Sequence, residues 1–388
     1  MNRHALKRGF SLVELLVVVA VIAVLAYVGL GAFPSMLRAS DRSLAANQLR
    51  VGLGAARDAA IRGDGGDSAA VFIYDPVSRR TSIVPCVMVG TFKDVDPADV
   101  NGFPARAAID RELFVPLPNV DAVQLPANWL VSGFANEGML DTPSNLTGWY
   151  VSGAANPDRE IDTTGGAWVF PETDYYNIDF DPSTRRQYGK YERYTFMVRF
   201  AARTGAAMFG EDHPVAVLLA RPTSVGRSQN PIERGLRPDL ADNIVSWAKR
   251  VLSRPIAANA NGSDQSGAIG LTLRSDVLGA SRMDSVLAAS VTSLGVVDAR
   301  ELATGMGIRA NNRETGTAYQ INTGSDTLPK WDPNAIGGTS KSELARNIDQ
   351  WMTGTRVPPG PAGTKAVTSD VQLFVVQAAD GRPVPMTE

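Results

Sequence analysis

The residue with the clearest chemical consequence is Glu14, a single carboxylate inside a long apolar run. Residues 10–33 read FSLVELLVVVAVIAVLAYVGLGAF, and Glu14 is the only charged residue among them. A carboxylate in hydrocarbon costs about 2.5–3.5 kcal/mol even on mild insertion scales. It therefore needs a partner, which must be a chain terminus, another chain or a lipid headgroup, because the run itself carries no positive charge.

The junction between Gly9 and Phe10 is the second candidate for chemistry. Residues 1–9 read MNRHALKRG, a short, polar and basic segment. A cut between Gly9 and Phe10 would create an amine on Phe10, one helical turn away from Glu14. That amine, or the same amine on a neighbouring chain, could neutralise the carboxylate. The alternative is that Glu14 reaches the membrane interface unaided from the first turn of the helix.

The apolar run is long enough to cross a bilayer as a helix, which takes about 20 residues. A secretory signal peptide has a shorter apolar core of about 7–15 residues and a small-x-small cleavage site, so the run is predicted to be a membrane span. Pro34 closes the run. Basic residues stand on both sides of it, so charge alone indicates its orientation only in part.

The rest of the sequence offers little to catalysis or metal binding. It contains no G-x-S-x-G, P-loop, H-E-x-x-H or C-x-x-C motif, and it has one cysteine, Cys86, and two histidines. His213 follows two acids and could act as a base, but we interpret it as a loop residue before a strand. We predict no catalytic residue, no cofactor and no metal site.

Composition and charge define the class of protein. The chain has 388 residues, of which 44% are hydrophobic, so it can bury a core. Its 38 basic and 40 acidic residues give a net charge of -2, and no nucleic-acid partner is expected from so neutral a chain.

A second helical segment is predicted after the apolar run. Ala45, Leu49, Leu53, Ala56 and Ala60 recur at helical spacing and place a narrow stripe of small and aliphatic residues on one face. Gly63 then ends the pattern. If it is continuous, a helix over residues 11–62 would be about 75 Å long.

The segment KRGFSLVELL at residues 7–16 resembles the signal of type IV prepilins and type II secretion pseudopilins. The resemblance implies that a prepilin peptidase cleaves after Gly9 and methylates Phe10. It also implies that Glu14 pairs with the amine of an adjacent subunit during assembly. The expected partners are that peptidase, other pseudopilins or pilins, and the inner-membrane assembly platform. The expected location is the bacterial inner membrane, with a single span and the body on the periplasmic side.

A six-residue run that leads into a predicted strand is similar to a run in minor pseudopilins of the H type. It consists of Ala56, Arg57, Asp58, Ala59, Ala60 and Ile61. The family also places a hairpin late in its globular domain, and residues 194–202 and 206–209 with Gly205 at the turn fit it. This chain is more than twice as long as typical members. Some pseudopilins bind calcium, and Asp174, Asp179 and Asp181 offer oxygen ligands, although their spacing fits no EF-hand loop.

We therefore predict an α+β protein with a long N-terminal stem helix, half transmembrane and half amphipathic, packed on a β-rich body with extra C-terminal helices. The predicted organisation is a leader at 1–9, a stem at 10–62, a β-rich domain at 63–255 and a C-terminal extension at 256–388. Strands are predicted near 69–74, 80–89, 129–132, 148–152, 166–170, 194–201, 215–220 and 371–377. One helix is predicted from the amphipathic face of residues 240–251, and a second follows the capping box at residues 340–343 and is stopped by Gly354. Between them, residues 256–340 are predicted to be long surface loops or a partly mobile insertion.

The predicted function is that of a structural, minor pseudopilin in a type II secretion system. Two alternatives remain at this point. One is a minor pilin of a type IV pilus, whose large body serves adhesion or DNA uptake. The other is an envelope enzyme that uses the stem only as a membrane anchor.

Overall fold

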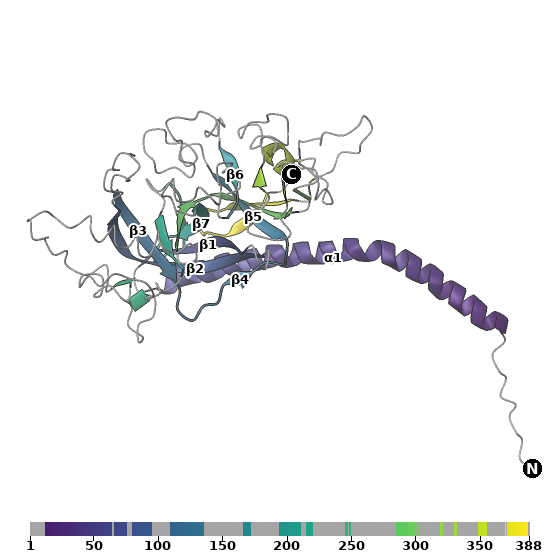
Figure 1. Cartoon of the computed structure of the whole chain (residues 1–388). Helices are drawn as coiled ribbons and strands as arrows, with labels where there is room; N and C mark the ends of the chain where they lie inside the picture. Colours follow the sequence, from purple (N-terminus) through teal and green to yellow (C-terminus); the bar gives the residue numbers. More distant parts are fainter. Residues whose placement is uncertain are drawn as a thin grey trace, which may run out of the picture.

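The structure, a computed structural model, describes the chain in several stretches (Figure 1). The longer stretches are residues 12–63, 66–75, 80–94, 109–135, 166–171, 194–210, 215–219, 285–299 and 371–386. Shorter ones are residues 245–246, 248–249, 301–302, 319–320, 330–331 and 348–354, and the single residue 369.

The N-terminal helix α1 spans Leu12–Arg62 and contains 51 residues. It continues through Pro34. Its C-terminal part lies along the β-rich body, and its N-terminal part projects beyond the body (Figure 1). The helix ends at Arg62, immediately before the predicted glycine cap, and Gly63 N donates the last helical hydrogen bond to the Ala59 carbonyl at 2.7 Å.

The body is built from strands that form three sheets. The strands are β1 (Ser68–Asp75), β2 (Arg80–Asp94), β3 (Ile109–Pro116), β4 (Val123–Gln124), β5 (Trp129–Ala135), β6 (Ala167–Val169), β7 (Tyr194–Phe200), β8 (Ala207–Met208), β9 (Val215–Leu218), β10 (Ser285–Ser290), β11 (Ser293–Asp298), β12 (Tyr319–Gln320), β13 (Lys330–Trp331), β14 (Gln372–Val376) and β15 (Pro383–Pro385). The first sheet has eight strands, the second has five and the third is the pair β12–β13.

The first sheet closes on itself. Its order is β1-β2-β3-β9-β10-β7-β8, and β1 also pairs with β7, so the strands from β1 to β7 form a ring. Side chains alternate between the two faces of a strand, so one set points into the ring. The inward set is a separate apolar cluster, which is made of Ala69, Val71, Cys86, Phe114, Met197, Val215, Val217, Val286 and Ala288.

The second sheet has the order β15-β14-β11-β5-β6. It is joined to the first through β10 and β11, which follow each other directly in the chain but belong to different sheets. Val291 N donates to the Met197 carbonyl of the first sheet, and Thr292 O accepts from Val376 N of the second. Residues 285–299 therefore fasten the two sheets together.

The main core lies between α1, the outer face of the closed sheet and the second sheet. The predicted inner stripe of α1 (Ala45, Leu49, Leu53, Ala56 and Ala60) is buried, which confirms the predicted face. On the sheet side, the rings of Phe72 and Phe196 stack with centroids 4.7 Å apart. Small residues on α1 allow the helix to approach these strands closely.

The α+β class and the β-rich body agree with the prediction, and seven predicted strands correspond to β1, β2, β5, β6, β7, β9 and β14. The predicted hairpin is confirmed, since β7 pairs antiparallel with β8 and Gly205 has a positive φ of 67°. The predicted strand at 148–152 lies outside the described residues. Helical residues at 245–246, 248–249 and 348–352 fall within the two predicted C-terminal helices, whose remaining residues lie outside the description.

The prediction of loops or a mobile insertion over 256–340 is wrong for residues 285–299. These residues form β10 and β11, which occupy interior positions in the two large sheets. Their small side chains, read in SVLAASVTSLGVVD, weaken the apolar alternation by which a strand is recognised. Segments on both sides of residue 255 thus contribute strands to the same sheets.

Candidate assembly surface

The structure places one of the three predicted site residues. Glu14 lies in the first turn of α1, and it is exposed. Gly9 and Phe10 precede Leu12, and both lie outside the described residues. The structure therefore positions the carboxylate but not the junction at which cleavage is predicted.

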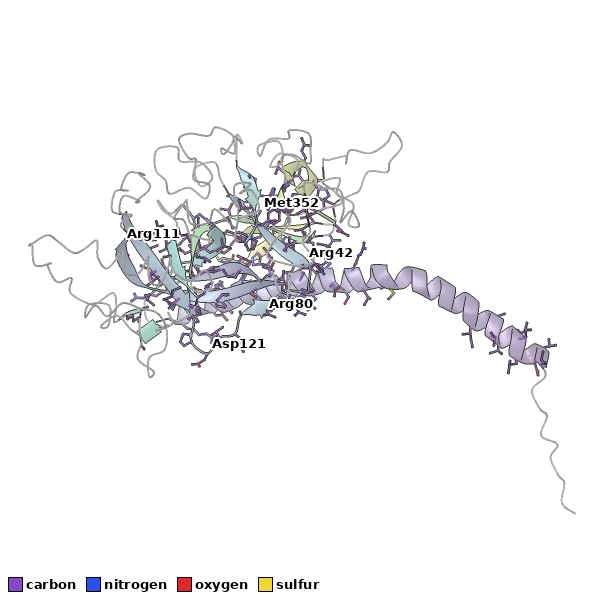
Figure 2. The ribbon with its side chains drawn as sticks, in the orientation of Figure 1. Arg42, Arg80, Arg111, Asp121 and Met352 are labelled. Atoms are coloured by element: carbon purple, nitrogen blue, oxygen red, sulfur yellow. The ribbon has the colours of Figure 1, made fainter. Side chains whose placement is uncertain are left out.

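The surroundings of Glu14 are apolar and exposed. We call residues 12–22 the projecting segment. Its large exposed side chains are Leu12, Val13, Leu15, Leu16, Val17, Val18, Val19, Val21 and Ile22. Figure 2 shows these turns of α1 well away from the body, which the helix reaches near Arg42. In the part of the chain that the structure describes, no helix is both long and apolar enough to span a membrane.

A second apolar feature lies closer to the body, on the side of α1 opposite the buried stripe. We call Leu37, Leu44 and Val51 the outer stripe. Their exposed fractions run from 47% to 60%. Residues seven apart lie almost above one another on a helix, so these three form a line along it. Such a line is the pattern that a helix presents to a neighbouring helix.

Polar contacts hold α1 to the body on either side of this stripe. Arg38 lies 3.7 Å from Glu301, and the Arg50 guanidinium lies 5.5 Å from the centre of the Phe374 ring. Further along, Ser68 Oγ donates to the Ala56 carbonyl at 2.6 Å.

The last turn of α1 is also tied to the β7–β8 hairpin. Arg203 N donates to the Ala60 carbonyl at 2.9 Å, which satisfies a carbonyl that has no partner within the helix. Gly205 lies so close that a Cβ there would come within 2.9 Å of Ile61 Cγ1. These contacts give the helix one defined position, so the outer stripe faces away from the body.

Arg199, Asp67 and Glu112 form a largely buried cluster of charges in the described part of the body. Arg199 Nη2 lies 2.6 Å from Asp67 Oδ2 and 2.9 Å from Glu112 Oε1, and Nη1 donates to Glu112 Oε2. Asp67 Oδ1 also accepts from Ala202 N at 3.0 Å. The cluster links β7, β3 and the residue that precedes β1, and the Arg199 guanidinium lies 5.4 Å from the ring centre of Phe114.

The electrostatics of the cluster favour the charged guanidinium. Burial by itself lowers the pKa of Arg199, but the hydrogen bonds and negative charges of Glu112 and Asp67 outweigh it and raise the pKa above its ordinary value. We interpret the cluster as a structural clamp on the closed sheet.

Cys86 is also structural in its surroundings. Its side chain is fully buried inside the closed sheet, and burial raises the pKa of its thiol. His213 and the acidic residues Asp174, Asp179 and Asp181 lie outside the described residues. Among the described residues, no group of three or more His, Cys, Asp or Glu could hold a metal ion.

Sequence reasoning did not find two of these features. The outer stripe has a readable signal, because Leu37, Leu44 and Val51 recur every seventh residue. The charge cluster has no such signal, because Asp67, Glu112 and Arg199 are far apart in the chain and are brought together only by strand pairing.

Comparison with known proteins gives one finding. A family model described as the prokaryotic N-terminal methylation motif matches residues 5–26. The matched span includes Gly9, Phe10 and Glu14 and continues into α1. Neither the curated proteins nor the solved structures contain a match to this chain.

Proposed function

We propose that this chain is a structural, minor pseudopilin of a type II protein secretion system. Prepilin peptidase cuts after Gly9 and methylates Phe10, and residues 10–33 then hold the mature chain in the bacterial inner membrane with its body on the periplasmic side. The chain is the substrate of that peptidase and is not itself an enzyme. The observation that carries the proposal is the N-terminal methylation motif at residues 5–26, which continues into the projecting segment of α1.

The motif is typical of type IV pilins and pseudopilins, which are membrane-associated and assemble with related subunits. In the proposed assembly, Glu14 pairs with the amine of Phe10 on a neighbouring chain. A carboxylate in an apolar environment is stabilised strongly by a cation and poorly by lipid. This pairing would therefore set the axial position of one subunit relative to the next.

The outer stripe supplies the proposed second contact. Leu37, Leu44 and Val51 are turned away from this chain's own body, and their spacing suits a helix that crosses α1 at a shallow angle. Each of these side chains is already about half covered by its own chain, so we expect full covering to contribute roughly half of the ~1.5–3 kcal/mol that burial of a whole aliphatic side chain provides. The stem would then contact its neighbour above the membrane as well as within it.

A secretion subunit is favoured by the H-type pattern of the sequence. The run from Ala56 to Ile61 leads through Gly63 into β1, and the β7–β8 hairpin comes late in the first sheet. The enlarged body is the departure from that pattern, and we assign it to contacts that a minor subunit makes at a specific place in the filament.

The test of the assembly role is crosslinking in intact membranes. Glu14→Leu is expected to insert and to be cleaved after Gly9 like the wild type, but to lose its crosslinks to other pseudopilins. Val17→Leu, one turn away and without a change of charge, is the matched control and should crosslink normally. Equal crosslinking of Glu14→Leu and the wild type would show that the Glu14 side chain only extends to the membrane–water interface and does not take part in assembly.

The same strains separate secretion from a pilus function. In a deletion strain we expect the loss of secreted proteins from the medium, restored by the wild type and not by Glu14→Leu. Loss of surface pili, adhesion or DNA uptake with secretion intact would instead assign the chain to a type IV pilus.

Leu44→Asp should weaken assembly at the outer stripe, whereas Ser43→Asp, which adds the same charge at the neighbouring exposed position, should not.

A further inference from the structure

The second sheet ends in an unusual strand. β15 pairs with β14 in antiparallel register, with Phe374 opposite Pro385, Val375 opposite Val384 and Val376 opposite Pro383. In the described part of the chain, no strand follows it in the sheet order. An exposed edge of this kind normally offers a row of unpaired N–H and C=O groups to any strand that approaches it.

The hydrogen bonds show which residues face that edge. Met386 N donates to the Leu373 carbonyl at 2.9 Å, and the Arg382 carbonyl accepts from Gln377 N at 3.0 Å. Along a strand of an antiparallel pair, the backbone N–H and C=O groups of one residue point towards the partner strand, and those of the next residue point away from it. Arg382, Val384 and Met386 therefore point their groups towards β14.

Pro383 and Pro385 alternate with these three residues, so their backbone groups face the open side of β15. Both are prolines, so neither has an N–H to donate. The edge thus offers carbonyl oxygens but no backbone donor along β15, and an incoming strand can form only part of its ladder.

The same edge carries an apolar surface. Val375, Val384 and Met386 have exposed fractions between 36% and 52%, and residues opposite each other or two apart on paired strands share one face. An exposed, apolar edge strand is the feature through which sheets join edge to edge. Here the apolar side chains are present and the backbone donors are absent.

We propose that Pro383 and Pro385 block strand addition at β15, so that two copies of this chain cannot join their five-stranded sheets by pairing β15 with β15. Two copies that met at this edge would bring two donor-free strands together and could form no N–H···O bonds across it. The body is thereby kept from associating through the β15 edge, and this holds whether or not the chain assembles through α1.

The experiment restores the donors. Pro383→Thr combined with Pro385→Thr places two N–H groups on the open side of the full-length chain. In detergent, analytical ultracentrifugation should show self-association at protein concentrations about tenfold or more below those of the wild type, since each new hydrogen bond adds a modest favourable term. Pro118→Thr, at an exposed proline outside every strand, is the control and should leave association unchanged.

Two further variants make the result decisive. Adding Val384→Lys to the double variant places a charge on the edge strand and should restore the wild-type behaviour, as it would for specific edge pairing. If the double variant does not fold, Pro385→Thr alone restores one donor and should give an intermediate shift. A folded variant with restored donors that associates no more than the wild type would overturn the proposal.

Discussion

Gly52 of α1 lies directly against Ile83 of β2. A Cβ placed on Gly52 would come within 2.7 Å of Ile83 Cγ2 and within 2.9 Å of Ile83 Cβ. Gly54, two residues further along the same helix, has no atom within 4 Å of an equivalent Cβ. One glycine is therefore needed for packing, and the other is not.

Alanine at these two positions should act in opposite directions. Gly54→Ala is expected to raise the free energy of unfolding by about 0.5–1 kcal/mol, because alanine favours the helix over glycine. Gly52→Ala is expected to lower it by about 1–2 kcal/mol, because overpacking against the branched Ile83 exceeds that gain. Urea unfolding of the two detergent-solubilised variants measures the difference, and equal stability would show that α1 can move away from β2 at little cost.

The charge cluster predicts a large effect at one arginine. Arg199 has a side chain that is 7% exposed, and Glu112 beside it is 28% exposed. Arg199→Leu leaves two carboxylates close together without their cation and should destabilise the fold by about 3–5 kcal/mol. Arg62→Ala is the control, because its 3.5 Å pair with Asp58 is exposed and such pairs contribute little.

The pH dependence of this cluster follows from the sign of its shift. The pKa of Arg199 is raised in the folded protein, so the stability it provides is fully present below its unfolded pKa and is lost only as the pH rises through the folded value. Both values lie far above neutral pH, so titration of Arg199 should remove no stability between about pH 6 and pH 9. Thermal unfolding of the wild type across that range tests this, and a steep loss towards about pH 9 would contradict it.

The cysteine provides a direct probe of the closed sheet. Burial raises the pKa of the Cys86 thiol, so the reactive thiolate is disfavoured, and the folded sheet also shields the sulfur. The native protein is expected to resist alkylation by iodoacetamide at about pH 8 and to react fully in denaturant. Ser43→Cys adds a cysteine at an exposed helical position and should be modified at once. Rapid labelling of Cys86 in the native protein would mean that the ring of strands opens readily.

The cleavage junction predicts a defined mature terminus. If the proposed processing is right, the mature chain begins with N-methyl-Phe10, which lies within the matched methylation motif. Gly9→Val should leave the precursor uncut, because it changes the residue after which the peptidase is expected to cleave. Mass spectrometry of the membrane-extracted protein measures both results, with Ala5→Val in the leader as the control. A wild-type protein that retains Met1 would contradict the processing prediction.

The predictability of the strands depended on their side chains. β1, β7 and β9 are rich in branched and aromatic residues, and local pattern was enough to find them. β3 reads IDRELFVP, and the three consecutive charged residues Asp, Arg and Glu interrupt the apolar pattern by which a strand is predicted. Two of those charged residues are buried or partly buried in the fold, Arg111 at one face and Glu112 in the charge cluster.

The sequence by itself predicted the junction after Gly9, and it determined the place of the Glu14 carboxylate in an apolar run and the buried stripe of α1. These depend on residues that are neighbours along the chain or along one helix, where spacing is fixed by covalent geometry and by 3.6 residues per turn. Only the tertiary structure decided that β1 meets β7, that Arg199 meets Asp67 and Glu112, and that Pro383 and Pro385 line a sheet edge. Those relationships arise from pairings between distant segments, and many registers satisfy the same local pattern until the whole core is packed.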